Sequence, residues 1–155
     1  MSDVAETTNA GLSRIELNIP LRAEYVSVIR LTGSGIASRA GFDIDTVEDI
    51  KICMSEVCNN LLNDKAKKGS DKETNILIEF LVSIGCLTIN FTIAGAEGWA
   101  PSIDEDDENV YGLMIARVLM DNFEIRRQDD LEDGLEGGLE GGLIVSMTKR
   151  TAEIY

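Results

Sequence analysis

Apolar and polar residues alternate in several short segments of the chain, which is the pattern of a strand that buries one face. Two of these segments flank a turn at Gly85 and predict a β-hairpin, and the first segment ends at Pro20, which cannot continue a central strand. The alternation predicts strands at 14–19, 76–82, 87–93, 123–125 and 143–148.

Three other segments, 23–40, 45–65 and 111–121, carry apolar residues at three- and four-residue spacing and predict amphipathic helices. Each of the first two helices should therefore present one buried stripe to a common core. The predicted stripes are Tyr25, Val28, Ile29, Thr32 and Ile36 on the first helix, and Val47, Ile50, Met54, Cys58 and Leu61 on the second.

Glycine and acidic residues mark the ends and the weak points of these helices. Gly41 is placed to end the first helix, and Asp45 with Glu48 three residues later can form a capping box for the second. Gly33 and Gly35 each weaken the first helix by roughly 1 kcal/mol relative to alanine. Their small size would permit close packing against a neighbouring element.

The order strand, helix, helix, paired strands, helix, two strands predicts an α+β fold. We expect a two-layer sandwich, in which one mostly antiparallel mixed sheet carries helices on one face. The segments fit a single domain at 13–150 with short tails at 1–12 and 151–155. Loops are expected at 96–109 and at 129–142, where Gly-Leu-Glu-Gly occurs twice in succession.

Composition narrows the possible functions. The formal net charge of −14 disfavours binding to nucleic acid or to an anionic membrane and favours a basic protein partner. The chain has no histidine, which excludes histidine-based catalytic triads and metal sites. Cys53, Cys58 and Cys86 lie in apolar surroundings and are expected to be buried free thiols. Without a signal-peptide core or a membrane-spanning segment, the expected location is the cytoplasm.

The second predicted helix carries a polar pair outside its apolar stripe. Glu56 and Asn60 are one turn apart, with Ile52 and Cys53 on the same side. A carboxylate and a carboxamide at that spacing can orient a hydroxyl group and hold a magnesium ion. A solvated polar helix surface is the other interpretation of the same two residues.

Five segments together resemble one family of bacterial regulators. The similarity extends from about residue 15 to 149 and is strongest in the first 60 residues. The segments are EYVSVIRLT at 24–32, VEDIKI at 47–52, SEVCNN at 55–60, LMD at 119–121 and SMTK at 146–149. With this order and spacing the chain is similar to the anti-sigma serine-protein kinases of partner switching, which have the histidine-kinase-like ATPase (Bergerat) fold.

The resemblance implies a homodimer that binds ATP and Mg²⁺, sequesters a sigma factor, and phosphorylates a STAS-domain anti-anti-sigma protein. Carried onto this chain, Glu56 matches the general base of the family and Asn60 its magnesium ligand, which also contacts the nucleotide. Arg30 on the first helix is a candidate anchor for a protein partner, because arginine is favoured at interfaces. An exposed helix arginine without a partner is the alternative interpretation.

The nucleotide motifs depart from the family pattern. Ala96 stands where the family has an aspartate that accepts a hydrogen bond from adenine, whereas Gly98 of the same motif is kept. The glycine-rich turn before the third helix is reduced to Gly112, and Ile144 replaces an adenine-pocket threonine. The acidic run at 104–108 lies where the ATP lid is expected, and a solvated loop remote from the nucleotide is the other interpretation of this run. These changes predict that nucleotide binding is weakened or lost while the protein-binding surface persists.

Three functions therefore remain open. The first is an anti-sigma factor that acts through protein contacts, with its kinase activity in doubt. The second is a fully active serine-protein kinase, and transfer of phosphate to a STAS-domain protein would distinguish it from the first. The third is a non-catalytic dimerisation module, for which alanine at Glu56 and Asn60 should change stability by no more than roughly 0.5 kcal/mol.

Overall fold

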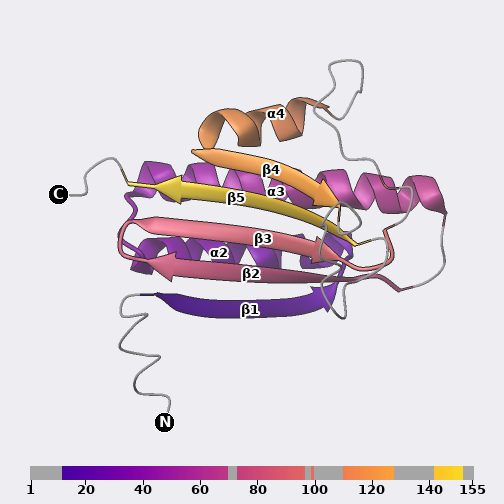
Figure 1. Ribbon diagram of the computed structural model, residues 1–155, viewed down its shortest axis with the longest axis horizontal. Helices are drawn as coiled ribbons and strands as arrows, with labels where there is room; N and C mark the ends of the chain where they lie inside the picture. The colour runs from indigo at the N-terminus through magenta and orange to yellow at the C-terminus, as the bar shows by residue number, and fades with distance from the viewer. Residues whose placement is uncertain (1–11, 70–72, 97–98, 100–109, 128–141, 152–155) are drawn as a thin grey trace, which may run out of the picture.

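The computed structural model describes residues 12–69, 73–96, 99, 110–127 and 142–151, and it contains the predicted elements in the predicted order. Most of the predicted tails and most of the two predicted loops lie outside these residues. In chain order the elements are β1 Ser13–Pro20, a short 3₁₀ turn η1 Ala23–Tyr25, α2 Val26–Arg39, α3 Ile44–Lys68, β2 Asn75–Ser83, β3 Cys86–Ile93, α4 Val110–Leu119, β4 Asn122–Arg127 and β5 Leu143–Arg150 (Figure 1).

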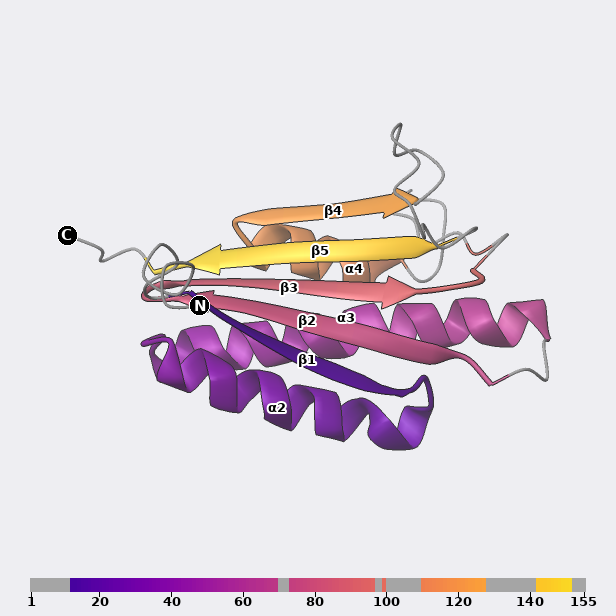
Figure 2. The ribbon, with the colours of Figure 1, turned by 60° about the horizontal axis from the view of Figure 1, so that its bottom comes forward.

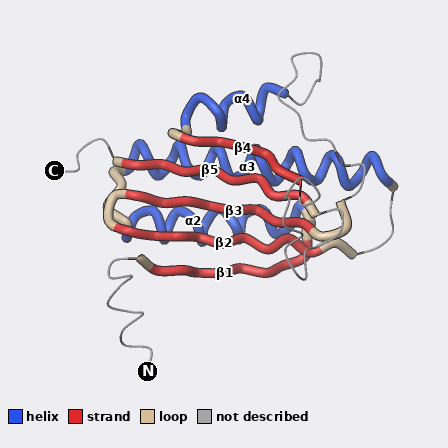
Figure 3. Tube along the Cα trace, in the orientation of Figure 1, coloured by secondary structure: helices blue, strands red, loops and turns tan. Residues whose placement is uncertain are grey.

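The five strands form one sheet in the order β1-β2-β3-β5-β4 (Figure 3). Each neighbouring pair is antiparallel, so the predicted mostly antiparallel sheet is confirmed and the described pairings include no parallel one. The hairpin of β2 and β3 pairs Ser83 with Cys86 around the turn that contains Gly85. β5 is inserted between β3 and β4, so the last strand of the chain completes the centre of the sheet.

All three α-helices pack on one face of the sheet, which confirms the two-layer α+β sandwich (Figure 2). The core lies between the layers. It is formed by alternate residues of the central strands and by the inner faces of the helices. Its largest fully buried side chains include Phe80, Phe91, Ile50, Met54 and Leu61.

The two predicted helix stripes had different outcomes. All five predicted residues on α3 are buried. On α2 the buried line is Ile29, Gly33 and Ala37, whereas Val28 is 41% exposed. The prediction for Val28 was wrong because glycine and alanine give no apolar signal, although their small size lets α2 lie close to α3.

The cap of α3 also differs from the sequence prediction. Asp43, not Asp45, is the N-cap residue: its Oδ1 accepts a hydrogen bond of 2.8 Å from the backbone N–H of Thr46. This hydrogen bond lowers the pKa of Asp43 below its ordinary value. Gly41, at φ 98°, lies just beyond the end of α2, as predicted, and allows the chain to turn sharply into α3.

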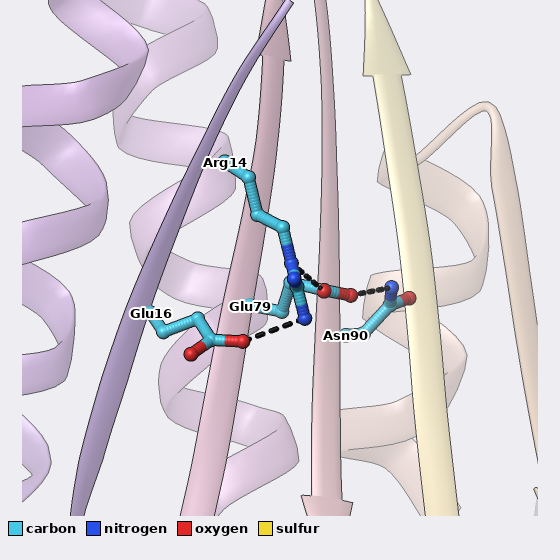
Figure 4. Close-up of polar contacts among 4 residues, drawn as sticks. All are labelled: Arg14, Glu16, Glu79 and Asn90. Carbon is cyan, nitrogen blue, oxygen red and sulfur yellow. Dashed lines mark hydrogen bonds and ion pairs between the residues drawn. The ribbon is translucent and has the colours of Figure 1, made fainter. Parts of the chain in front are cut away.

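No helix that the structure describes covers the other face of the sheet, which carries a polar chain across four strands. Figure 4 shows the part of this chain on β1, β2 and β3. Arg14 on β1 is paired with Glu79 on β2 and with Glu16 at 2.6 Å. Asn90 on β3 donates to Glu79 at 3.0 Å and accepts from Ser146 on β5 at 2.6 Å. The hydrogen bond from Asn90, with Arg14 adding to it, lowers the pKa of Glu79. These contacts fix the register of the strands from the open face.

The three cysteines are free, as predicted, but only Cys53 and Cys58 are buried. Burial raises the pKa of each of these two thiols to about 12, so neither is a reactive thiolate at neutral pH. Cys86 begins β3 on the open face and is only half-buried. Along the described residues, no helix is long and apolar enough to cross a membrane.

Gly33 and Gly35 allow a matched test of helix packing. A Cβ atom at Gly33 would lie 2.2 Å from Cε of Met54, which is fully buried on α3, whereas a Cβ at Gly35 would meet no atom within 4 Å. We expect Gly33→Ala to lower the free energy of unfolding by about 1 kcal/mol, because overpacking outweighs the better helix propensity. Gly35→Ala should raise it by up to about 1 kcal/mol.

Urea denaturation of both variants measures this difference. Equal stabilisation by the two alanines would show that α2 and α3 are not in close contact at Gly33. A Met54→Ala background should remove most of the cost of Gly33→Ala, because the atoms that clash are then absent.

Candidate functional site

The helix α3 positions the predicted polar pair. Val57 and Leu61, next to Glu56 and Asn60 in sequence, are fully buried, so they hold this turn of α3 against the rest of the core. As a result Glu56 is half-buried and Asn60 is only 7% exposed. Asn60 is therefore not part of a solvated helix surface, which was the other interpretation of the sequence, whereas Glu56 stays partly accessible.

Glu56 opens onto a shallow groove between α2 and α3 that also contains Arg30. The groove has a volume of about 250 Å³ and is lined by Arg30, Glu48, Lys51, Ile52, Ser55 and Glu56. It is smaller than the roughly 300–1,000 Å³ of a typical small-molecule pocket. The groove thus brings together the predicted base and the predicted partner anchor, which are far apart in sequence.

The charges in this groove are only partly paired. Lys51 Nζ lies 3.0 Å from Glu48 Oε2 on the same helix. Neither Arg30 nor Glu56 makes a hydrogen bond or ion pair with any residue that the structure describes. A guanidinium and a carboxylate are thus both available at the surface of one groove.

The predicted adenine end of the site lies where β3 ends. Ala96 is 0% exposed and belongs to the hydrophobic core. The backbone N–H of Trp99 donates to the carbonyl oxygen of Ala96 at 3.0 Å. Arg127 Nη1, at the end of β4, donates to the same oxygen at 3.4 Å. The Trp99 side chain is 5% exposed and packs in the core.

The last strand does not contribute to this region as predicted. Ile144 is opposite Thr92 of β3 and Arg126 of β4, on the open face of the sheet, so it cannot line a pocket between sheet and helices. The neighbouring Leu143 faces the helices and is 1% exposed. The sequence predicted the alternation of this strand correctly, but it assigned Ile144 to the pocket, although Leu143 is the residue that faces the helices.

The remaining candidate residues are placed only in part. Gly112 lies in the first turn of α4. Gly98 and the acidic run at 104–108 lie outside the described residues. Within the described residues, no group of three or more acidic or cysteine side chains is arranged to hold a metal ion.

Sequence reasoning missed Trp99 and Arg127. Trp99 is the single tryptophan of the chain and comes three residues after Ala96, in a segment that the sequence assigned to a loop. A large aromatic residue in a predicted loop was the signal that could have identified it. No comparable signal marks Arg127, because its contact with Ala96 depends on how the strands are arranged.

A helix pair and an antiparallel sheet, with a carboxylate and a buried carboxamide one turn apart on α3, define a histidine kinase-like ATPase domain. The model of that family matches residues 19–149, and the chain belongs to it. Its relatives include the serine-protein kinase RsbW of Bacillus mycoides (strain KBAB4), with 32% identity over 128 residues. The RsbW of Bacillus cereus (strain AH187) is 30% identical over the same length. Each alignment covers 76% of this chain and 80% of the relative.

A solved structure agrees with this fold. The RsbU and RsbW domains of a Mycobacterium tuberculosis protein match with a TM-score of 0.60 at 15% sequence identity. The match covers 89% of this chain but only 32% of that longer chain. The resemblance to the serine-protein kinases of partner switching, noted in the sequence, is thus confirmed by the RsbW relatives.

The family implies ATP as a ligand, and the two ends of the site fit it unequally. Glu56 and Asn60 on α3 keep the donor types that a phosphate-transfer site with a metal ion requires. At the adenine end, the side chains of Ala96, Leu143 and Trp99 offer no carboxylate, amide or hydroxyl oxygen to the polar edge of a purine. Among the residues that the structure describes at this end, these three side chains therefore do not fit the base of ATP.

Proposed function

We propose that this protein is an anti-sigma factor, which sequesters a sigma factor and interacts with a STAS-domain anti-anti-sigma protein through direct protein contacts. Membership of the family and similarity to the RsbW serine-protein kinases support the regulatory class. The observation that carries the proposal is the groove between α2 and α3, where Arg30 is exposed and lies with Glu56 in one surface.

Exposed apolar side chains near Arg30 give this surface the composition of a protein-binding site. Ile52, which lines the groove with Arg30, is 44% exposed, and Leu31, the next residue on α2, is 66% exposed. An arginine among exposed aliphatic side chains is typical of interface anchors, since its planar head can make paired hydrogen bonds while the surrounding contacts exclude water. The surface is too shallow for a small substrate and suits a partner helix or loop.

The net charge of −14 supports a basic partner. Long-range attraction would speed the encounter and make its rate depend on ionic strength. Such a role requires the protein to be in the cytoplasm, where RNA polymerase acts, and it requires neither a membrane nor direct contact with nucleic acid.

The anchor role of Arg30 can be tested against a matched arginine on the same helix. We expect Arg30→Ala to weaken binding to the cognate sigma factor by about 10- to 100-fold, the effect of removing an interface anchor. Arg39→Ala removes an exposed arginine at the other end of α2 and should change affinity less than about threefold.

The measurement uses the full chain, without nucleotide, and each purified sigma factor and STAS-domain protein from the same genome in turn, by biolayer interferometry. Absence of binding to every one of these proteins would contradict the anti-sigma proposal. Equal losses of sigma-factor affinity in Arg30→Ala and Arg39→Ala would show that the groove is not the binding surface.

We further propose that the homodimer implied by the family forms through the open face of the sheet. The described strands direct three arginines and three glutamates to this face, so its formal charge is zero although the chain carries −14. Two copies of so acidic a chain repel each other over most surfaces, and a neutral face removes that repulsion. These six residues are Arg14, Glu16, Glu79, Glu124, Arg126 and Arg150.

Charge added to the open face should therefore separate the protomers. Leu77 lies on this face, half-buried, opposite Asn18 and Thr92. We expect Leu77→Glu to raise the dimer dissociation constant by about 100-fold or more, because two like charges would meet in the interface. Val118→Glu adds the same charge to α4, where Val118 is 79% exposed, and should leave the dimer intact. Analytical ultracentrifugation measures the monomer–dimer equilibrium of the wild type and both variants. A monomeric wild-type chain would refute the proposal.

An active serine-protein kinase is the second candidate. Two features favour it: the names of the relatives and the presence of both chemical groups on α3, Glu56 and Asn60. In that case Glu56 would accept the proton of the target serine and Asn60 would hold Mg²⁺. The misfit at Ala96 argues against it.

We expect no transfer of radiolabelled phosphate from ATP to a STAS-domain protein that binds the chain. Transfer that Glu56→Gln abolishes, while binding of the STAS-domain protein is kept, would establish the kinase instead. Transfer that survives Glu56→Gln would point to a contaminating kinase, which a repeat with a second purification would remove.

A further inference from the structure

We propose that the indole ring of Trp99 occupies the space that would hold the adenine base, so that the chain seals its own nucleotide site and purine and indole exclude each other. The inference deepens the proposed function, since it explains why this chain would regulate by contact rather than by phosphorylation. It rests on the assignment of the end of β3 as the adenine end of the site.

The first observation is the burial of the residues that would line the pocket. A nucleotide pocket that stands open leaves its lining accessible to water. Here Ala96 is 0% exposed and Leu143 is 1% exposed, and both belong to one continuous apolar cluster. Protein atoms therefore already cover the surfaces that a base would contact.

The second observation is the way in which Trp99 is held. Its backbone N–H donates to the carbonyl oxygen of Ala96 at 3.0 Å, which ties Trp99 to the residue at the adenine-acceptor position. Its side chain is 5% exposed within the same cluster. Indole, like purine, is a flat fused bicyclic ring, and among the side chains it is the one whose shape comes closest to that of a purine.

The third observation concerns hydrogen bonds. With alanine at position 96, the backbone carbonyl of Ala96 is the acceptor that this residue itself still offers to an adenine amino group. That oxygen already accepts from the Trp99 N–H and, at 3.4 Å, from Arg127 Nη1. A purine amino group would have to compete with both of these donors for the oxygen, whereas an indole ring has only one polar atom to satisfy.

Intrinsic fluorescence tests the inference directly, because the chain has one tryptophan. In the free full-length protein, we expect a blue-shifted emission that acrylamide quenches weakly. Titration with Mg-ATP should either produce no binding by calorimetry or produce binding accompanied by a red shift and faster quenching, as the indole leaves the pocket. Binding of Mg-ATP with unchanged emission and quenching would overturn the inference. Rapid quenching in the free protein would also overturn it.

A set of variants tests the same idea from the nucleotide side. Ala96→Asp alone should gain no more than a small affinity, because the indole still fills the space. The double variant Ala96→Asp with Trp99→Ala should bind Mg-ATP at least about tenfold more tightly than Ala96→Asp. A folded double variant that gains nothing, or an Ala96→Asp variant that binds equally well, would refute the inference.

The control is Phe42→Ala. Phe42 is a buried aromatic residue at the other end of the helix layer, where α2 turns into α3. Its removal also leaves a cavity where a buried aromatic ring stood, but it should produce no nucleotide binding. Circular dichroism identifies variants that are folded. If the double variant does not fold, the fluorescence of the wild-type chain decides alone.

The result is separable from the proposed anti-sigma function, because sigma-factor binding is measured without nucleotide. A chain that binds no sigma factor but fails to admit ATP until Trp99 is removed would refute the function and support the sealed site. A chain that binds a sigma factor and also binds Mg-ATP while Trp99 stays buried and unquenched would support the anti-sigma function and refute the sealed site.

Discussion

The burial of α3 against the sheet is the interaction on which the rest of the structure depends. One face of this helix packs on the central strands, and its sides contact α2 and α4, so it joins all the helices to the sheet. The close approach of α2 at Gly33 and Met54 fixes the spacing of the two helices and with it the width of the groove at their surface. Because α3 is held on several sides, the orientations of Glu56 and Asn60 follow from packing.

The site that α3 carries is divided into two parts with different chemistry. The groove toward α2 is charged and accessible, and it joins Arg30 to Glu56. The region at the end of β3 is apolar and filled, and it contains Ala96 and Trp99. An ATP-dependent kinase needs both parts to be polar and open, whereas a regulator that acts by protein contact needs only the first. This division is the physical basis for the anti-sigma function proposed for this member of the histidine kinase-like ATPase family.

The two faces of the sheet make a similar division. The inner face is apolar and forms the core with the helices. The open face carries the ion pairs and hydrogen bonds of Arg14, Glu79, Asn90 and Ser146, which satisfy the polar groups across four strands. Excess negative charge is therefore carried elsewhere on the molecule. A neutral face on a strongly acidic chain restricts where two copies can meet, and other acidic surfaces remain available to attract a basic partner.

The sequence by itself determined the class of fold, the order of the elements and the polar pair on α3. It could do so because alternation and helical spacing are local properties, and because Glu56 and Asn60 are only one turn apart. It also predicted, from the resemblance, the loss of the adenine acceptor at Ala96. It misassigned Val28 and Asp45, whose roles depend on the close approach of α2 and on where the first turn of α3 begins.

Only the tertiary structure decided which residues from distant segments share a site. It joined Arg30 to Glu56 across two helices and placed Leu143, not Ile144, toward the core. It also brought Trp99 and Arg127 to the carbonyl of Ala96. The contact of Arg127 with Ala96 joins residues 31 apart in the chain, and it depends on strand register, which no local pattern of side chains encodes.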